Sequence, residues 1–176
     1  REDRTKAKAD YKKAFSTVSA NFNIGLKLAE NYNALKEFDQ ALNVLKHIEK
    51  QDPNNPALFN LACVVFVAKQ DWPQLESKAL HWTRSYPNDP AAWHMLCTAL
   101  MEQGRHRLAE EYFRKILSIQ TENAEDLSVY GQICLQCFEF DKAKKALDKA
   151  EVLDPERPDL LVSLSLFHTY FGNFEQ

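Results

Sequence analysis

The stretch that decides the fold is PAAWHMLCTALMEQGRHRLAEEYFRKILSIQTEN, which spans residues 90–123. Its apolar residues recur every three or four positions on either side of Gly104. This spacing predicts two amphipathic helices joined by a short turn. Pro90 stands where the first helical residue should be, a place that tolerates proline well. Strand signals are absent.

The same two-helix unit recurs every 34 residues without insertion or deletion. One such hairpin cannot bury its apolar face alone, so the repetition predicts that the units stack into a solenoid. Residues 1–21 match the second helix of a preceding repeat, with Ala7, Tyr11 and Ala14 at the matching places. The units then span residues 22–55, 56–89, 90–123, 124–157 and, incompletely, 158–176.

Each unit has a small residue at its eighth place, where we expect the two helices to cross at close approach. Alanine at the twentieth place meets it from the other helix, except that the second unit has Leu75. The small residues are Ala29, Cys63, Cys97, Gly131 and Ser165. We expect first helices over 22–36, 56–69, 90–103, 124–137 and 158–171, and second helices over 39–51, 73–86, 107–119 and 141–153.

This pattern resembles the tetratricopeptide repeat family, whose 34-residue unit follows W-x2-L-G-x2-Y…A-x3-F…P. The resemblance implies an all-α fold, a right-handed α-solenoid of antiparallel helical hairpins. The second unit departs most, because Leu75 and Ala79 exchange sizes there. The third unit follows the pattern closely, through Trp93, Leu96, Cys97, Leu100, Ala109 and Phe113.

Neither end of the chain carries the polar capping helix with which solenoids usually finish. We therefore expect a piece of a longer array, with a turn at Gly172 and Asn173 before a second helix begins. We also expect the uncapped ends to self-associate through an apolar row on the last helix. That row comprises Leu160, Leu161, Leu164, Phe167, Phe171 and Phe174.

The composition limits the function. The 176 residues carry 22 Lys and Arg against 25 Asp and Glu, a net charge of −3, which argues against a nucleic-acid partner. No stretch approaches the roughly 18 apolar residues of a membrane span. Four cysteines are too sparse for a disulfide scaffold and fit a reducing compartment, so we predict a cytoplasmic protein.

The cysteine pair Cys134-x-x-Cys137 has a spacing found in redox and zinc sites. A zinc site needs a second pair at matching spacing, so we interpret both residues as packing residues. The sequence lacks the nucleophile-elbow, phosphate-loop and dinucleotide-binding motifs. We therefore predict no enzymatic activity, no cofactor and no metal.

The resemblance implies that first helices line a concave groove in which a protein or peptide partner binds. We predict a non-catalytic interaction scaffold. One alternative is a regulatory or targeting array of a larger enzyme, such as a glycosyl- or sulfotransferase. Another is a chaperone of secreted proteins. Glu30, Glu125 and Asp159 at the groove ends favour a basic or neutral ligand. The predicted partner-binding residues are Asn60, Val64, Val67, His94, Thr98, Met101, Ser128, Gln132 and Leu135.

Overall fold

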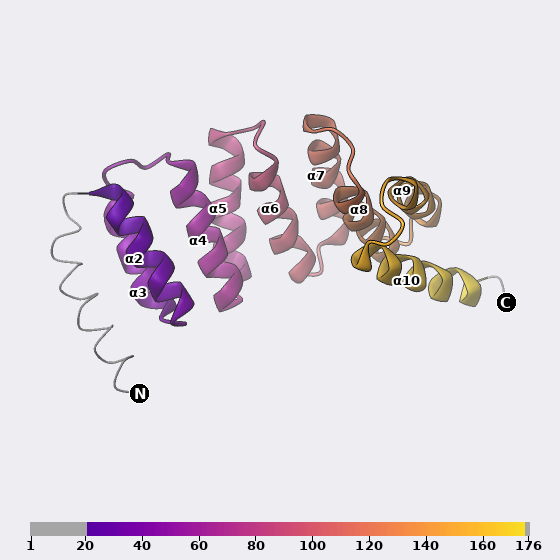
Figure 1. The fold of residues 1–176 in the computed structure, drawn as a ribbon, viewed down its shortest axis with the longest axis horizontal. Coiled ribbons are helices and arrows are strands. Elements are labelled where there is room, and N and C mark those ends of the chain that lie inside the picture. Colours follow the sequence, from indigo (N-terminus) through magenta and orange to yellow (C-terminus); the bar gives the residue numbers. More distant parts are fainter. Residues whose placement is uncertain (1–20, 175–176) are drawn as a thin grey trace. The chain divides into compact units, whose positions relative to one another are not determined.

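The computed structural model describes residues 21–174, with side chains over residues 21–171 (Figure 1). Every regular element in this range is an α-helix, as predicted. The predicted helix over residues 1–21 lies outside the described residues, apart from Asn21. The chain divides between Pro87 and Asn88 into two compact units, which we call unit 1 and unit 2.

Unit 1 consists, in its described part, of two successive hairpins. The first helix of each hairpin packs against its own second helix, and α4 also contacts both helices of the preceding hairpin. The helices are α2 (Phe22–Ala34), α3 (Phe38–Ile48), α4 (Pro56–Lys69) and α5 (Trp72–Ser85).

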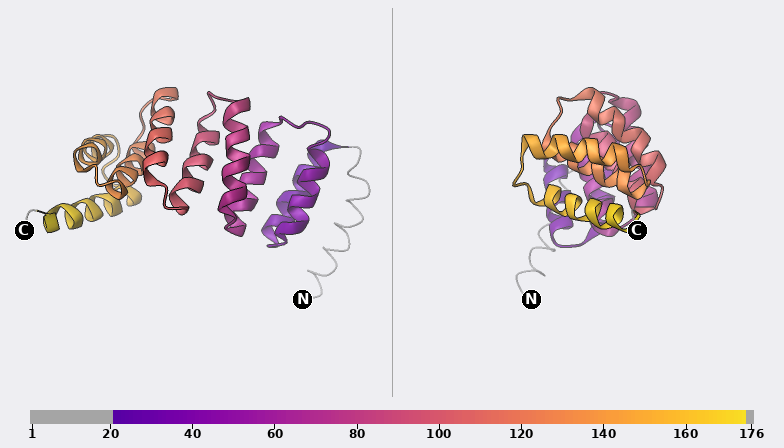
Figure 2. Two further views of the ribbon diagram at one scale, coloured as in Figure 1. Left: turned by 180° about the vertical axis from the view of Figure 1, so that it is seen from behind. Right: turned by 90° about the vertical axis from the view of Figure 1, so that its right-hand side faces the viewer.

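Unit 2 consists of two hairpins followed by a further helix. The second helix of its first hairpin contacts α8, and α10 packs against both α8 and α9 (Figure 2). The helices are α6 (Pro90–Glu102), α7 (His106–Ile119), α8 (Ala124–Gln136), α9 (Phe140–Leu153) and α10 (Pro158–Phe174).

All five first helices begin at the predicted residue, because a capping side chain precedes the start in at least four of them. The side chains of Asn55 and Asp89 each accept a hydrogen bond of 3.0 Å from the backbone N–H of the second residue in the helix that follows. Asn123 accepts one of 2.9 Å from the Asp126 amide. Asn21 caps α2 in the same way. Side-chain capping therefore fixes where each repeat begins.

Our predicted boundaries for the second helices were wrong by one residue at the start. These helices begin at Phe38, Trp72, His106 and Phe140, because the residue at the seventeenth place is already helical. The first helices in turn end one or two residues earlier than predicted in three of the five units. α3 ends at Ile48 and α5 at Ser85, whereas α7 and α9 end where predicted.

The first helices end early because the fifteenth residue of each complete repeat has a left-handed backbone conformation. These residues are Lys36, Gln70, Gly104 and Phe138, with φ between 58° and 72°. One residue further on, each backbone amide donates to a carbonyl five residues earlier, at 2.8–2.9 Å. This is the Schellman arrangement, which satisfies the last carbonyls of a helix.

The predicted turn at Gly172 and Asn173 was wrong, since α10 continues in helical conformation to Phe174. In each of the four hairpins the second helix packs back on the first and stabilises the left-handed turn. Gly172 stands at the same fifteenth place of its repeat, yet α10 does not end there.

The predicted crossing points lie at the centre of each hairpin. Ala29 and Cys63 are completely buried, and so is the alanine or leucine that meets each crossing at the twentieth place. The Cys97 thiol lies 3.6 Å from the Ala109 carbonyl oxygen, so the two backbones pass in near contact. Close approach therefore requires a small residue at this place.

Candidate functional site

Cys134 lies in the last turn of α8, and Cys137 follows the last residue of this helix. Cys134 and Cys137 are both buried. Burial raises the pKa of the Cys134 thiol to about 12 and also raises that of Cys137. The thiolate is the form that binds metals and attacks disulfides, so these thiols are poorly suited to either role. Within residues 21–171, no group of three His, Cys, Asp or Glu side chains is placed to hold a metal ion.

The predicted binding residues of unit 1 lie on one face of α4. Asn60, Val64 and Val67 are spaced by four and three residues, the spacing that aligns side chains on a helix. Asn60 is exposed, and the two valines are half-buried. This face therefore offers an amide beside an apolar surface.

The predicted residues of α6 form an equivalent face in unit 2. His94, Thr98 and Met101 repeat the spacing of four and three residues. Thr98 is exposed and its hydroxyl donates to the His94 carbonyl oxygen at 3.0 Å. The Met101 sulfur lies 3.5 Å from Nδ1 of His106 in α7. We call these three residues the α6 face.

The predicted residues of α8 are less accessible than the sequence suggested. Gln132 is half-buried and its Nε2 donates to Ser163 Oγ at 2.7 Å. Ser128 is completely buried and Leu135 is 2% exposed, so their predicted contact with a partner does not fit this structure. The cause is that α8 packs against α7, α9 and α10 together. Leu135 belongs to a core cluster that also contains Leu160 of α10.

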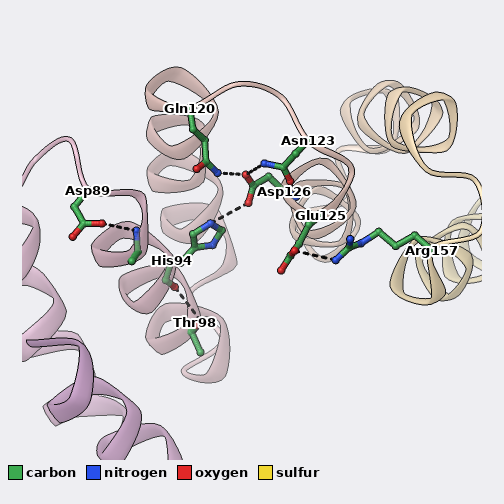
Figure 3. A network of polar contacts seen from close by, with 9 residues as sticks. Asp89, His94, Thr98, Gln120, Asn123, Glu125, Asp126 and Arg157 are labelled. Atoms are coloured by element: carbon green, nitrogen blue, oxygen red, sulfur yellow. Dashed lines mark hydrogen bonds and ion pairs between the residues drawn. The ribbon is translucent and has the colours of Figure 1, made fainter. Parts of the chain in front are cut away.

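A buried carboxylate fixes the imidazole of the α6 face (Figure 3). His94 Nε2 lies 3.0 Å from Asp126 Oδ1, and Asp126 is 4% exposed whereas His94 is 36% exposed. Asn123 Nδ2 donates to the other carboxylate oxygen at 2.6 Å, and the Gln120 amide donates to the same atom. The carboxylate thus ties α6 to α8 and orients the histidine, while about a third of the imidazole surface stays open.

Sequence analysis missed this network. His94 stands at the fifth place of one repeat and Asp126 at the third place of the next. One feature of the sequence could have indicated the network. Asp126 is an acidic residue at the third place of its repeat, where three other first helices carry leucine or alanine: Leu58, Ala92 and Leu160. A carboxylate at a core position requires polar partners, because burial of an unpaired charge is costly.

Two of the three acidic residues expected to attract a basic ligand, Glu125 and Asp159, are already paired within unit 2. Arg157 Nη2 lies 3.0 Å from Glu125 Oε2 (Figure 3). Arg157 Nε lies 2.8 Å from Asp159 Oδ1. The arginine neutralises much of their charge, so these two carboxylates give little preference for a basic ligand.

The apolar row predicted for α10 is only partly open. Leu160 and Phe167 are buried in unit 2, which corrects the prediction for these two residues. They pack with Leu135 in one cluster. Leu161 is 52% exposed and Phe171 is 39% exposed, so an apolar surface remains on α10. The Phe174 side chain lies outside the described part.

None of the described helices is long and apolar enough to cross a membrane.

Comparison with known proteins supports the repeat assignment. Two family models described as tetratricopeptide repeat match residues 1–62 and 90–123. No curated protein sequence matches the chain.

Solved structures share the fold at low sequence identity. A MamA structure from Desulfovibrio magneticus RS-1 is 18% identical, with a TM-score of 0.73 and coverage of 86% of this chain and 88% of the other. YrrB, described as a TPR protein with an unusual peptide-binding site, is 17% identical, with a TM-score of 0.72 and coverage of 93% and 84%. A thermophilic TPR protein from Thermus thermophilus, TTC0263, is 19% identical, with a TM-score of 0.66 and coverage of 93% of both chains.

At such identities the likeness concerns the fold alone: sequential helical hairpins of the TPR-like solenoid class. The family matches, the 34-residue period and the hairpin architecture agree with one another. The chain therefore belongs to the tetratricopeptide repeat family.

Proposed function

We propose that the chain is a non-catalytic scaffold that binds a segment of a partner protein on the exposed faces of its first helices. Tetratricopeptide repeat proteins typically mediate protein–protein interactions. YrrB, which is similar in fold, is described as having a peptide-binding site. The observation that carries the proposal is the α6 face, where Asp126 holds His94 in a fixed orientation beside the exposed Thr98.

The α6 face combines the groups that a peptide needs. A preoriented imidazole loses little conformational entropy when it binds, which favours affinity. The Thr98 hydroxyl offers a polar group for a peptide backbone, and half-buried Met101 supplies adaptable apolar contact. Of the three residues predicted to bind a partner on α8, only Gln132 remains partly accessible. The α4 face of unit 1, with Asn60, Val64 and Val67, offers a similar mixture.

The proposal is tested by site-specific photo-crosslinking in cells. A photoreactive amino acid replaces Thr98 on the α6 face in one variant and Lys115, exposed on α7, in the other. We expect position 98 to capture a defined partner protein and position 115 to capture none. Capture from position 115 alone would show that partners bind on the second helices instead.

A triple variant then measures the contribution of the predicted residues. Asn60→Ala, His94→Ala and Met101→Glu together should weaken binding of the captured partner by at least about tenfold, since each removes or repels a contact. The matched control carries Asn43→Ala and Lys115→Glu, which alter residues of α3 and α7. Equal affinity of both folded variants would refute binding on the first-helix faces.

We further propose a cytoplasmic location and weak self-association. All four cysteines are free thiols, which fits a reducing compartment. The exposed Leu161 and Val162 of α10 form an apolar surface of the kind that promotes association. Leu161→Lys with Val162→Lys should lower the apparent mass in sedimentation equilibrium if this surface mediates it, and an unchanged mass would refute that role.

A further inference from the structure

Unit 1 contains a cavity on the side of its second helices, away from the α4 residues proposed above. It has a volume of about 570 Å³, within the range of about 300–1,000 Å³ typical of ligand sites. Its floor comes from α4, where Leu58 and Ala62 are almost completely buried and Phe66 is half-buried. Leu42 of α3 and Gln74 of α5 stand on its two walls.

The repeat supplies an internal comparison, because each wall and floor residue has an equivalent two 34-residue periods later, in unit 2. Tyr130 takes the place of Ala62, and Glu110 takes the place of Leu42. The Tyr130 hydroxyl donates to Glu110 Oε1 at 2.8 Å. Its ring stacks on Phe113, with centroids 6.0 Å apart and planes inclined by 23°. An aromatic side chain of the protein itself therefore occupies the equivalent place in unit 2.

Two residues that line the cavity, Ala62 and Leu45, are smaller than their equivalents in unit 2, whereas Phe66 is larger than its equivalent Cys134. Ala62 lacks the whole ring of Tyr130, and Leu45 stands where unit 2 has Phe113. The floor of the cavity is thus apolar, and its Ala62 stands at the repeat place from which a tyrosine side chain extends in unit 2.

The rim offers polar groups that are not already engaged. Within residues 21–171, Lys46 forms no ion pair and the Gln74 side-chain amide forms no hydrogen bond, and both are exposed. Lys78 is different, because it pairs with Glu49 across the cavity between α5 and α3. Gln74 stands where unit 2 has Lys142, whose Nζ lies 3.4 Å from the carboxylate that binds the tyrosine hydroxyl.

We propose that this cavity is a docking site for a tyrosine side chain of a partner protein segment, which takes the place that Tyr130 holds in unit 2. The ring packs on Leu58, Ala62 and Phe66. The hydroxyl bonds to the amide of Gln74, and Lys46 bonds to a carbonyl or carboxylate of the flanking peptide. The α4 and α6 faces and this cavity are then separate binding surfaces.

The experiment uses p-cresol, the tyrosine side chain alone, added to the full chain and followed by amide chemical shifts. We expect saturable changes in the millimolar range, confined to amides around Leu45, Ala62 and Phe66. The matched variant is Leu42→Glu with Ala62→Tyr, which copies the Tyr130 and Glu110 pair into unit 1. It should fold and lose these changes, whereas p-cresol binding should persist in the α6-face variant Thr98→Ala.

The absence of saturable changes in the parent protein would overturn the proposal, and so would their persistence in the folded double variant. If the double variant does not fold, Ala62→Leu alone decides the question. Leucine is already the residue at the equivalent place of the next repeat, Leu96, and its side chain would fill the floor of the cavity. It should weaken p-cresol binding about tenfold or more, and unchanged affinity would refute docking.

Discussion

Gly131 in α8 passes so close to Leu147 in α9 that a Cβ added to the glycine would lie 2.6 Å from Leu147 Cδ2. Leu147 is completely buried, so its side chain has little room to move. Gly131→Leu should therefore lower the free energy of unfolding by about 1–3 kcal/mol, the usual cost of overpacking a core. Urea unfolding followed by circular dichroism measures the loss.

The control for this substitution is Ser165→Leu. Ser165 holds the same eighth place in α10, but it is exposed. This change should alter stability by no more than about 0.5 kcal/mol. A similar loss at both positions would mean that helix crossing is not what requires a small residue.

Two opposite substitutions test whether the left-handed conformation at the fifteenth place favours glycine. Gly104 has φ of 72° and an added Cβ would meet no atom within 4 Å, so Gly104→Ala changes only the backbone energy. It should destabilise the protein by about 1 kcal/mol. Gln70 has φ of 58° and is exposed, so Gln70→Gly should relieve strain and stabilise by up to about 1 kcal/mol. Changes of the same sign in the melting temperatures would contradict this account.

Asp126→Ala should destabilise the protein because it removes the acceptor of three side chains. We expect a loss of about 2 kcal/mol, since hydrogen bonds to a buried charge exceed neutral ones. His94→Ala should cost less, because its ring is partly solvated. The His94 ring also packs edge-on against Phe113, with centroids 5.4 Å apart. Denaturant midpoints of the two variants check the order, and a larger loss for His94→Ala would show that this packing dominates.

The buried thiols should make the protein less stable at high pH. Burial raises the pKa of Cys97 from its ordinary value near 9 to about 12. Above pH 9 the thiol ionises in the unfolded chain but stays protonated in the folded protein. The folded state then binds more protons, so the free energy of unfolding falls as pH rises from 9 towards 12.

Cys97→Ala isolates the contribution of this thiol. One thiol lowers the free energy of unfolding by at most about 1.4 kcal/mol per pH unit. The alanine variant should show a shallower decline over this range than the parent protein. Parallel curves for the two proteins would mean that other groups govern the alkaline transition.

The sequence was sufficient for the hairpins and their period, because capping residues and small crossing residues are local signals that recur. It did not predict every helix boundary, since the second helices start one residue earlier and several helices end elsewhere than expected. The left-handed residue at position 138 is a phenylalanine, which carries no turn signal. Gly172 at the same repeat place did not stop α10, so a glycine is neither required for this turn nor sufficient for it.

The candidate site was less predictable, because accessibility depends on neighbouring helices. His94 and Thr98 were placed on one face by their repeat places, carried over from the family resemblance. Ser128 shares the repeat place of His94 and yet is buried, since the helices around α8 differ from those around α6. The contact between Asp126 and His94 joins two successive repeats. The periodicity within one helix does not reveal which residues of neighbouring repeats meet.

The recurrence of the left-handed turn also constrains how the chain can evolve. A duplication or deletion of 34 residues keeps every left-handed residue in phase with the carbonyl that its turn satisfies. Insertion of one residue inside a hairpin would instead force a helical side chain into that conformation. Recombination in the loops before Pro56, Pro90 and Pro158 can therefore change the number of hairpins, whereas a single-residue length change within a hairpin would shift the left-handed residue out of register with that carbonyl.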